Sequence, residues 1–90
     1  MIRHEWRATQ EDGATRLYRL TFDRSQWRLR SRLKREEEWQ DHQPLSRAEA
    51  EAAREVVWNK YQRKRGAWKY VDSLDALVER LGGERLVKDP

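Results

Sequence analysis

The sequence contains no cysteine. This absence excludes disulfide bonds and metal sites built on thiolates, and it makes the reducing cytoplasm the expected compartment. Long apolar runs are missing too, since no segment approaches the roughly 20 residues that an α-helix needs to span a bilayer. The first ten residues, MIRHEWRATQ, also lack the apolar core that a secretory signal requires. We therefore expect a cytoplasmic protein that has no membrane as a partner.

Apolar residues are fewer than is usual for a folded domain. Hydrophobic residues make up 37% of the chain and charged residues 40%. Five tryptophans and three tyrosines offset this shortage, because each large aromatic ring buries much apolar area. Chains that stay disordered are typically poor in aromatic residues. A chain of 90 residues has the length of one small domain, and we predict a single domain spanning residues 1–90.

Motifs for catalysis and cofactor binding are also missing. Asp41, His42 and Ser46 are close in sequence, but a catalytic triad needs a spatial arrangement that closeness in sequence does not provide. The pair Gly82-Gly83 lacks the preceding strand and the following Lys-Ser or Lys-Thr of a phosphate-binding loop. The carboxylates of Glu36–Glu38 would alternate between two faces of a strand, which is unfavourable for sharing a metal ion with His42. We therefore expect no enzymatic activity, no cofactor and no catalytic or metal-binding residue.

Residues 16–35 form the stretch around which the rest of the chain is organised. Apolar residues alternate with polar ones on both sides of Asp23–Gln26, and a period of two is the signal of a strand. We predict two antiparallel strands joined by a tight turn, with Arg24 and Ser25 at its tip. The facing pairs are then Leu20 with Leu29, Phe22 with Trp27, and Arg19 with Arg30. All of the apolar residues lie on one face of this hairpin.

A third strand is predicted at Ile2–Thr9, where the same alternation occurs. Turn residues follow it at Glu11–Gly13, and the glycine can adopt a positive φ. A loop of three or five residues keeps Trp6 on the apolar face, whereas a two-residue loop would turn the strand over. We therefore favour an odd loop length, and with three residues Trp6 faces Tyr18. His4 then lies on the apolar face as a core histidine.

The opposite face of this three-stranded meander is rich in arginine. Glu5 is its only acidic residue, and Leu17 and Thr21 fill its remaining places. Like charges that face each other across strands are unfavourable, so a chain that keeps them suits a partner of opposite charge. Arginine is preferred where a planar fork must hold phosphate or carboxylate. We call this surface the Arg face, and it consists of Arg3, Arg7, Arg19, Arg28, Arg30 and Arg32.

Two interpretations of the Arg face follow from the sequence. In the first, the face is solvated and balanced by Glu36–Glu38 or by the acidic start of the following helix. In the second, it binds an anion, and nucleic acid is the commonest polyanion for such a patch. The predicted Arg face has no aromatic residue, although modules that read unstacked bases on a sheet usually carry one. It would therefore hold backbone phosphate and carry little information about base sequence.

A long helix is predicted at residues 47–64. Ser46 suits the N-cap position, and Glu49 completes a capping box. Gly66 is the expected residue after the helix end. Apolar residues recur at helical spacing at Ala50, Ala53, Val57 and Tyr61.

The remaining residues predict three short elements. We expect a strand at Ala67–Val71, a helix at Leu74–Leu81 capped by Asp72 or Ser73, and a last strand at Glu84–Lys88. The predicted fold class is α+β. In it, a three-stranded antiparallel meander packs on one long helix, with a short C-terminal helix and short C-terminal strands.

A second basic cluster surrounds the predicted end of the long helix. Residues 56–70 contain five lysines or arginines and no acid, between segments 36–55 and 71–90 with net charges of −5 and −2. Such charges suit the negative end of a helix dipole. They also suit a second phosphate-contacting site with Trp68 as a stacking residue. This second basic cluster consists of Lys60, Arg63, Lys64, Arg65 and Lys69.

The sequence supports three functions from different classes. The first is a small non-catalytic nucleic-acid-binding protein that grips backbone phosphates through the Arg face. The second is a protein-interaction module, an adaptor or inhibitor, whose Arg face docks on an acidic protein surface. The third is an enzyme subunit without its own active site. Trp39, which follows three glutamates, suits a protein-docking loop or a fold back over the core edge. The sequence assigns no oligomeric state.

Overall fold

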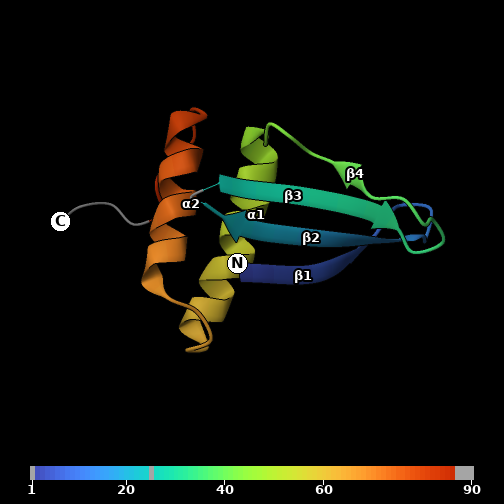
Figure 1. Cartoon of the computed structure of the whole chain (residues 1–90), viewed down its shortest axis with the longest axis horizontal. Coiled ribbons are helices and arrows are strands. Elements are labelled where there is room, and N and C mark those ends of the chain that lie inside the picture. The colour runs from blue at the N-terminus through green and yellow to red at the C-terminus, as the bar shows by residue number, and fades with distance from the viewer. Residues whose placement is uncertain (1, 25, 87–90) are drawn as a thin grey trace. The chain divides into compact units, whose positions relative to one another are not determined.

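The computed structural model describes residues 2–24 and 26–86, and it confirms the α+β class with an antiparallel sheet and two helices (Figure 1). The chain forms two compact units, Met1–Leu45 and Ser46–Pro90. The first unit contains the sheet and the second contains the helices. The prediction that residues 1–90 form one domain stays a prediction. The elements are β1 (Ile2–Thr9), β2 (Thr15–Asp23), β3 (Gln26–Leu33), β4 (Gln40–Asp41), α1 (Arg47–Gln62) and α2 (Trp68–Arg80).

The sheet has the order β1-β2-β3-β4, and every neighbouring pair of strands is antiparallel. Between β1 and β2, the amide of Gln10 donates to the carbonyl of Ala14 at 2.7 Å, which encloses three residues, one of the two odd loop lengths that the sequence allowed. Gly13 in that loop has a φ of 86°, as its turn position requires. Trp6 pairs with Tyr18 as predicted, and their rings are stacked with centroids 5.3 Å apart.

The register of the second hairpin is also confirmed. Leu20 pairs with Leu29, and Arg19 pairs with Arg30, so parity along both strands is as the alternation predicts. Asp23 pairs with Gln26 at the turn, while Ser25 lies outside the described residues. The prediction missed one strand of the sheet. This strand is β4, whose two residues pair with the edge of β3.

Burial follows the predicted face of the sheet. Leu20, Trp27 and Leu29 are buried, and so is His4, which the alternation places among core positions. Ser31 is fully buried on the same face, in register with Tyr18. In the helical unit, the buried positions come from both helices and recur at helical spacing: Ala50, Ala53, Val57, Val71, Leu74, Asp75 and Val78.

Helix α1 begins as predicted and ends earlier. The Ser46 hydroxyl accepts from the amide of Glu49 at 3.1 Å, and the Glu49 carboxylate accepts from the amide of Ser46 at 2.9 Å, so the capping box is confirmed. The prediction that Gly66 follows the helix end was wrong. Helix α1 ends at Gln62, and Lys64, two residues before the glycine, takes the left-handed conformation with a φ of 61°.

The predicted strand at Ala67–Val71 was wrong, because this segment begins α2. Val71 continues the apolar spacing of Leu74 and Val78 by one more turn, and all three side chains are buried. The predicted caps Asp72 and Ser73 therefore lie inside the helix. Ala67 is the N-cap and makes no side-chain capping bond.

The predicted last strand is not present in its described part. Residues 84–86 have no strand conformation, and residues 87 and 88 lie outside the described residues. In the part of the chain that the structure describes, neither helix is long and apolar enough to cross a membrane.

Candidate functional site

The Arg face exists as a continuous surface of the sheet. Pairing in register places its six arginines on three neighbouring strands, on the side opposite the buried Leu20 and Leu29. Four of the side chains are exposed, with fractions of 51% for Arg3 and 45% for Arg28, whereas Arg19 and Arg32 are half-buried. The predicted placement of these arginines is therefore correct, while their role in binding stays a prediction.

Two carboxylates lie among the arginines. Glu5 is 3.6 Å from Arg3 and 3.7 Å from Arg19, measured between carboxylate oxygens and guanidinium nitrogens. Asp41 of β4 lies 3.6 Å from Arg28. These separations exceed the range of a good hydrogen bond. Exposed pairs of this kind contribute about 0–1 kcal/mol to stability, so they leave the arginines accessible to a competing anion.

Trp39 also lies on the Arg face. The guanidinium carbon of Arg19 is 4.4 Å from the centre of the Trp39 ring, and that of Arg32 is 5.1 Å away. Both distances are within the range of cation–π attraction. Arg32 further donates to the carbonyl of Glu36 at 2.6 Å, which ties the preceding loop to β3. The prediction of an Arg face without an aromatic residue was therefore wrong, since a loop residue supplies one.

The glutamates before Trp39 form no ion pair with the arginines of the Arg face among the described residues. In the described part of the chain, none of the Glu36–Glu38 carboxylates forms an ion pair, and Glu36 instead accepts from the amide of Leu33 at 3.0 Å. Six arginines thus share the face with two acids, Glu5 and Asp41, which leaves an excess of four positive charges.

Two arginines of this face have no partner among the described residues. Within residues 2–24 and 26–86, the side chains of Arg7 and Arg30 make no hydrogen bond, ion pair or ring contact. Both side chains are exposed. Their five donors each remain available to an incoming group.

A hollow of about 260 Å³ indents the Arg face beside Trp39. Leu17 and Arg32 face each other in register, and Leu17 also pairs with Arg7 on its other side. An apolar side chain therefore lies between two arginines in this hollow. Its lining consists of Glu5, Trp6, Arg7, Leu17, Tyr18, Arg19, Arg32 and Trp39.

The second basic cluster lies around the turn between α1 and α2. Arg63, Lys64 and Arg65 are exposed there, and Lys69 lies over the ring of Tyr70 at 5.2 Å. Lys60 belongs to α1. The structure thus brings the predicted residues together in the helical unit.

Trp68, the stacking residue predicted for that cluster, is already in contact with two rings. Its ring centre is 5.3 Å from that of Tyr61 and 6.3 Å from that of Trp58, the latter edge-on. The Trp68 side chain is nevertheless exposed, with 39% of its surface accessible. It therefore serves in packing while keeping part of its surface open.

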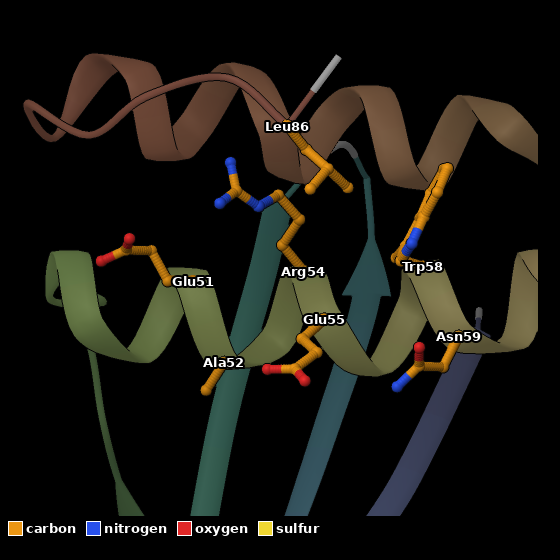
Figure 2. Close-up of a pocket in the computed structure, with 7 residues that line it drawn as sticks. All are labelled: Glu51, Ala52, Arg54, Glu55, Trp58, Asn59 and Leu86. Atoms are coloured by element: carbon orange, nitrogen blue, oxygen red, sulfur yellow. The ribbon is translucent and has the colours of Figure 1, made fainter.

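A second hollow, of about 640 Å³, lies along α1 (Figure 2). Figure 2 shows Arg54 and Trp58 extending from α1 toward α2, and Leu86 pointing back toward α1. Arg54 donates to the Asp75 carboxylate at 2.8 Å and to the Glu84 carbonyl at 2.7 Å, so this cation is occupied. Glu51, which also lines the hollow, pairs with Arg47 of the same helix at 3.4 Å. With its arginine occupied and a carboxylate on its lining, the hollow suits an anion poorly.

Asp75 is the centre of a buried ionic network that the sequence did not reveal. Its side chain is 2% exposed, and it accepts from the amide of Leu86 at 2.6 Å and from Arg54. Arg85 donates to it at 3.4 Å and to Asp72 at 3.0 Å. The hydrogen bond with Asp75 raises the pKa of Arg85 above its ordinary value. This network fastens the segment after α2 to the helices.

A serine and a histidine also meet in the sheet unit. The Ser31 hydroxyl is 2.6 Å from Nε2 of His42, and Arg16 donates to the same hydroxyl at 3.0 Å. Ser31 is fully buried, so its oxygen is inaccessible to a substrate. The Asp41 carboxylate pairs with Arg28 and the Ser46 hydroxyl caps α1. All of these groups have structural contacts.

Comparison with known proteins adds no relative. No model of a protein family matches the chain, and neither a curated protein nor a solved structure is similar to it. Among the described residues, no three side chains of histidine, cysteine, aspartate or glutamate are placed to hold a metal ion. The geometry of the Arg face therefore carries the functional argument alone.

Proposed function

We propose that the protein is a small non-catalytic nucleic-acid-binding protein that grips backbone phosphates through the Arg face. The observation that carries this proposal is the pair Arg7 and Arg30, whose exposed side chains have no partner among residues 2–24 and 26–86. They belong to a face with four positive charges in excess of its acids. A planar guanidinium can donate two parallel hydrogen bonds to one phosphate.

The weak ion pairs of the face also suit a phosphate partner. Glu5 and Asp41 hold their arginines at 3.6–3.7 Å, without short hydrogen bonds. A phosphate that approaches Arg3 or Arg28 has only a weak exposed pair to displace. We further propose that the exposed Arg63 and Arg65 of the second basic cluster add phosphate contacts. We also propose that the apolar face of the sheet packs on the long helix, as the sequence predicts, because this packing would leave the Arg face free for the partner.

The salt dependence of affinity tests this proposal. Each phosphate that an arginine neutralises releases counterions, and about four contacts give a log–log slope near −3.6 on duplex DNA at roughly −0.9 per phosphate. We expect Arg30→Ala to make this slope shallower by about one and to weaken all sequences alike. Arg80→Ala is the matched control, since it removes the same charge from an exposed position of α2. Absence of binding to DNA and RNA at low salt would remove the proposal.

A protein-interaction module is the second candidate, and Trp39 favours it. Tryptophan and arginine dominate the residues that carry binding energy at protein interfaces, and Trp39 with Arg19 and Arg32 forms such a group on an exposed face. This candidate predicts a stoichiometric complex with one acidic protein. Arg30→Ala should then abolish the complex in a pull-down, because the partner's buried charge is left unpaired. Nucleic-acid binding would be weak at physiological salt.

A further inference from the structure

We propose that the hollow beside Trp39 accepts one unstacked base of a single-stranded nucleic acid. This inference rests on the proposed function and deepens it, since it selects single strands over duplexes. The base would stack on Trp39 while Arg7 and Arg30 hold phosphates on either side of it. The argument depends on three features of the hollow, namely its apolar floor, its aromatic ring and its size.

The floor of the hollow is apolar. Leu17 is half-buried and lies in register between Arg7 on β1 and Arg32 on β3. A surface that holds only phosphates gains nothing from a leucine at this place, because a phosphate is fully charged and hydrated. A nucleobase has a large apolar face, and contact with Leu17 removes that face from water.

The aromatic ring comes from Trp39, which lies at the hollow and is half-buried. The guanidinium carbons of Arg19 and Arg32 lie over this ring at 4.4 and 5.1 Å and orient it, and a base that stacks on a covered face takes the place of one of them. A ring that is already fixed loses little conformational freedom when a base stacks on it. Proteins that bind single strands without sequence preference combine aromatic stacking of this kind with a positively charged groove.

The size of the hollow limits what it accepts. Its volume of about 260 Å³ lies below the roughly 300–1,000 Å³ of pockets for drug-sized ligands. A single base is a small flat ring system, and it can enter only when it is unstacked and unpaired. A base inside a duplex is covered on both faces by its neighbours, so a duplex can reach the arginines and not the hollow.

Two arginines of the Arg face are available to hold the phosphates of a strand whose base enters the hollow. Arg7 lines the hollow and has no partner in the described part of the chain. Arg30 lies next to Arg19 across the strands and is also without a partner there. Two available cations therefore lie on the same face as the ring, Arg7 on β1 at the hollow and Arg30 on β3. Glu5 is at the hollow too, where its carboxylate pairs with Arg3 and Arg19.

The experiment compares single-stranded oligothymidylate with a blunt duplex of equal length at one salt concentration. We expect Trp39→Leu to weaken binding of the single strand by roughly 5- to 150-fold, the effect of removing a stacking ring, and to leave duplex binding nearly unchanged. Trp39→Phe keeps an aromatic face and should retain most of the affinity. Trp68→Leu is the matched control, because it removes an exposed tryptophan from the helical unit.

Two further measurements keep the test decisive. Stacking releases no counterions, so Trp39→Leu should leave the salt slope of single-strand binding unchanged, unlike Arg30→Ala. A 2-aminopurine placed in the oligonucleotide should lose fluorescence on binding to the wild type and much less on binding to Trp39→Leu. If Trp39→Leu lowers the stability of the fold, Leu17→Ser tests the floor of the hollow instead, with the same expected loss for single strands.

The outcomes separate this inference from the function on which it rests. Equal loss for single strand and duplex, or no loss for either, would overturn the inference. If the inference is overturned but Arg30→Ala still makes the salt slope shallower, the proposal that the Arg face binds phosphate stands. If no nucleic acid binds at low salt, the proposed function fails, and the base site fails with it.

Discussion

The two units use charged residues in opposite ways. In the sheet unit, Glu5 and Asp41 approach their arginines only to 3.6–3.7 Å and remain about half exposed. In the helical unit, Asp75 is 2% exposed and meets Arg54 at 2.8 Å. A short buried pair cannot be given up without leaving a charge away from water, whereas a long exposed pair can. The comparison therefore separates charges that hold the fold from charges that can turn to a partner.

The largest loss of stability is expected when the buried ion pair of the helical unit is broken. We expect Asp75→Asn to destabilise the protein by about 3–5 kcal/mol, because Arg54, with 13% of its side chain exposed, keeps its charge and loses its counterion. Unfolding in urea measures the change. Glu79→Gln is the matched control, since Glu79 is exposed on the same helix. A loss below 1 kcal/mol for Asp75→Asn would mean that the two units do not differ in this way.

The sheet unit should depend on apolar burial instead. We expect Leu20→Ala to cost about 2–5 kcal/mol of stability, because Leu20 is fully buried and its truncation leaves a cavity. Leu17→Ala is the control on the same strand, with its side chain on the Arg face and only half-buried. Thermal or urea unfolding measures both variants. Equal losses for the two leucines would contradict the assignment of faces.

The smallest effect on stability is expected for an acid of the Arg face. Glu5→Gln should change stability by less than about 1 kcal/mol, because both of its ion pairs are long and exposed. The same change should strengthen nucleic-acid binding at low salt, since the face gains one net positive charge. Glu11→Gln, at an exposed turn position, is the control for overall charge. Weaker binding by Glu5→Gln than by Glu11→Gln would show that the Glu5 carboxylate contacts the ligand directly.

The sheet could be predicted well because its information is local. A period of two and the parity of the loops determine which residues face each other, so the pairs Trp6 with Tyr18 and Leu20 with Leu29 follow from the sequence. The start of α1 could be predicted for a similar reason, since Ser46 and Glu49 are three residues apart.

The start of α2 could not be predicted from the same kind of pattern. Trp68 and Tyr70 alternate with lysine and alanine and imitate a strand, although the buried Val71 belongs to the helical stripe. Short runs of this length fit both periods, and packing in the folded chain decides between them. Lys64 was missed because glycine is the usual residue in the left-handed position after a helix.

The candidate site was predicted only in part, because its remaining parts come from distant residues. The arginines lie on strands and follow from alternation, but Trp39 comes from a loop that Arg32 holds against the sheet. No periodic pattern in the sequence indicates this return of the loop. The network of Asp75 with Arg54 spans 21 residues and was missed for the same reason. One available clue to the loop was a tryptophan next to charged residues in a chain with few apolar residues.

The position of β1 in the sheet has a consequence for solubility. Among the strands of the described residues, β1 has a neighbour on one side only, and its eight residues would offer a long template for another chain. Arg3, Glu5 and Arg7 project from this strand and are exposed. Charged side chains on an edge strand oppose its pairing with further strands, so residues that suit a phosphate partner also protect the protein against aggregation through its edge.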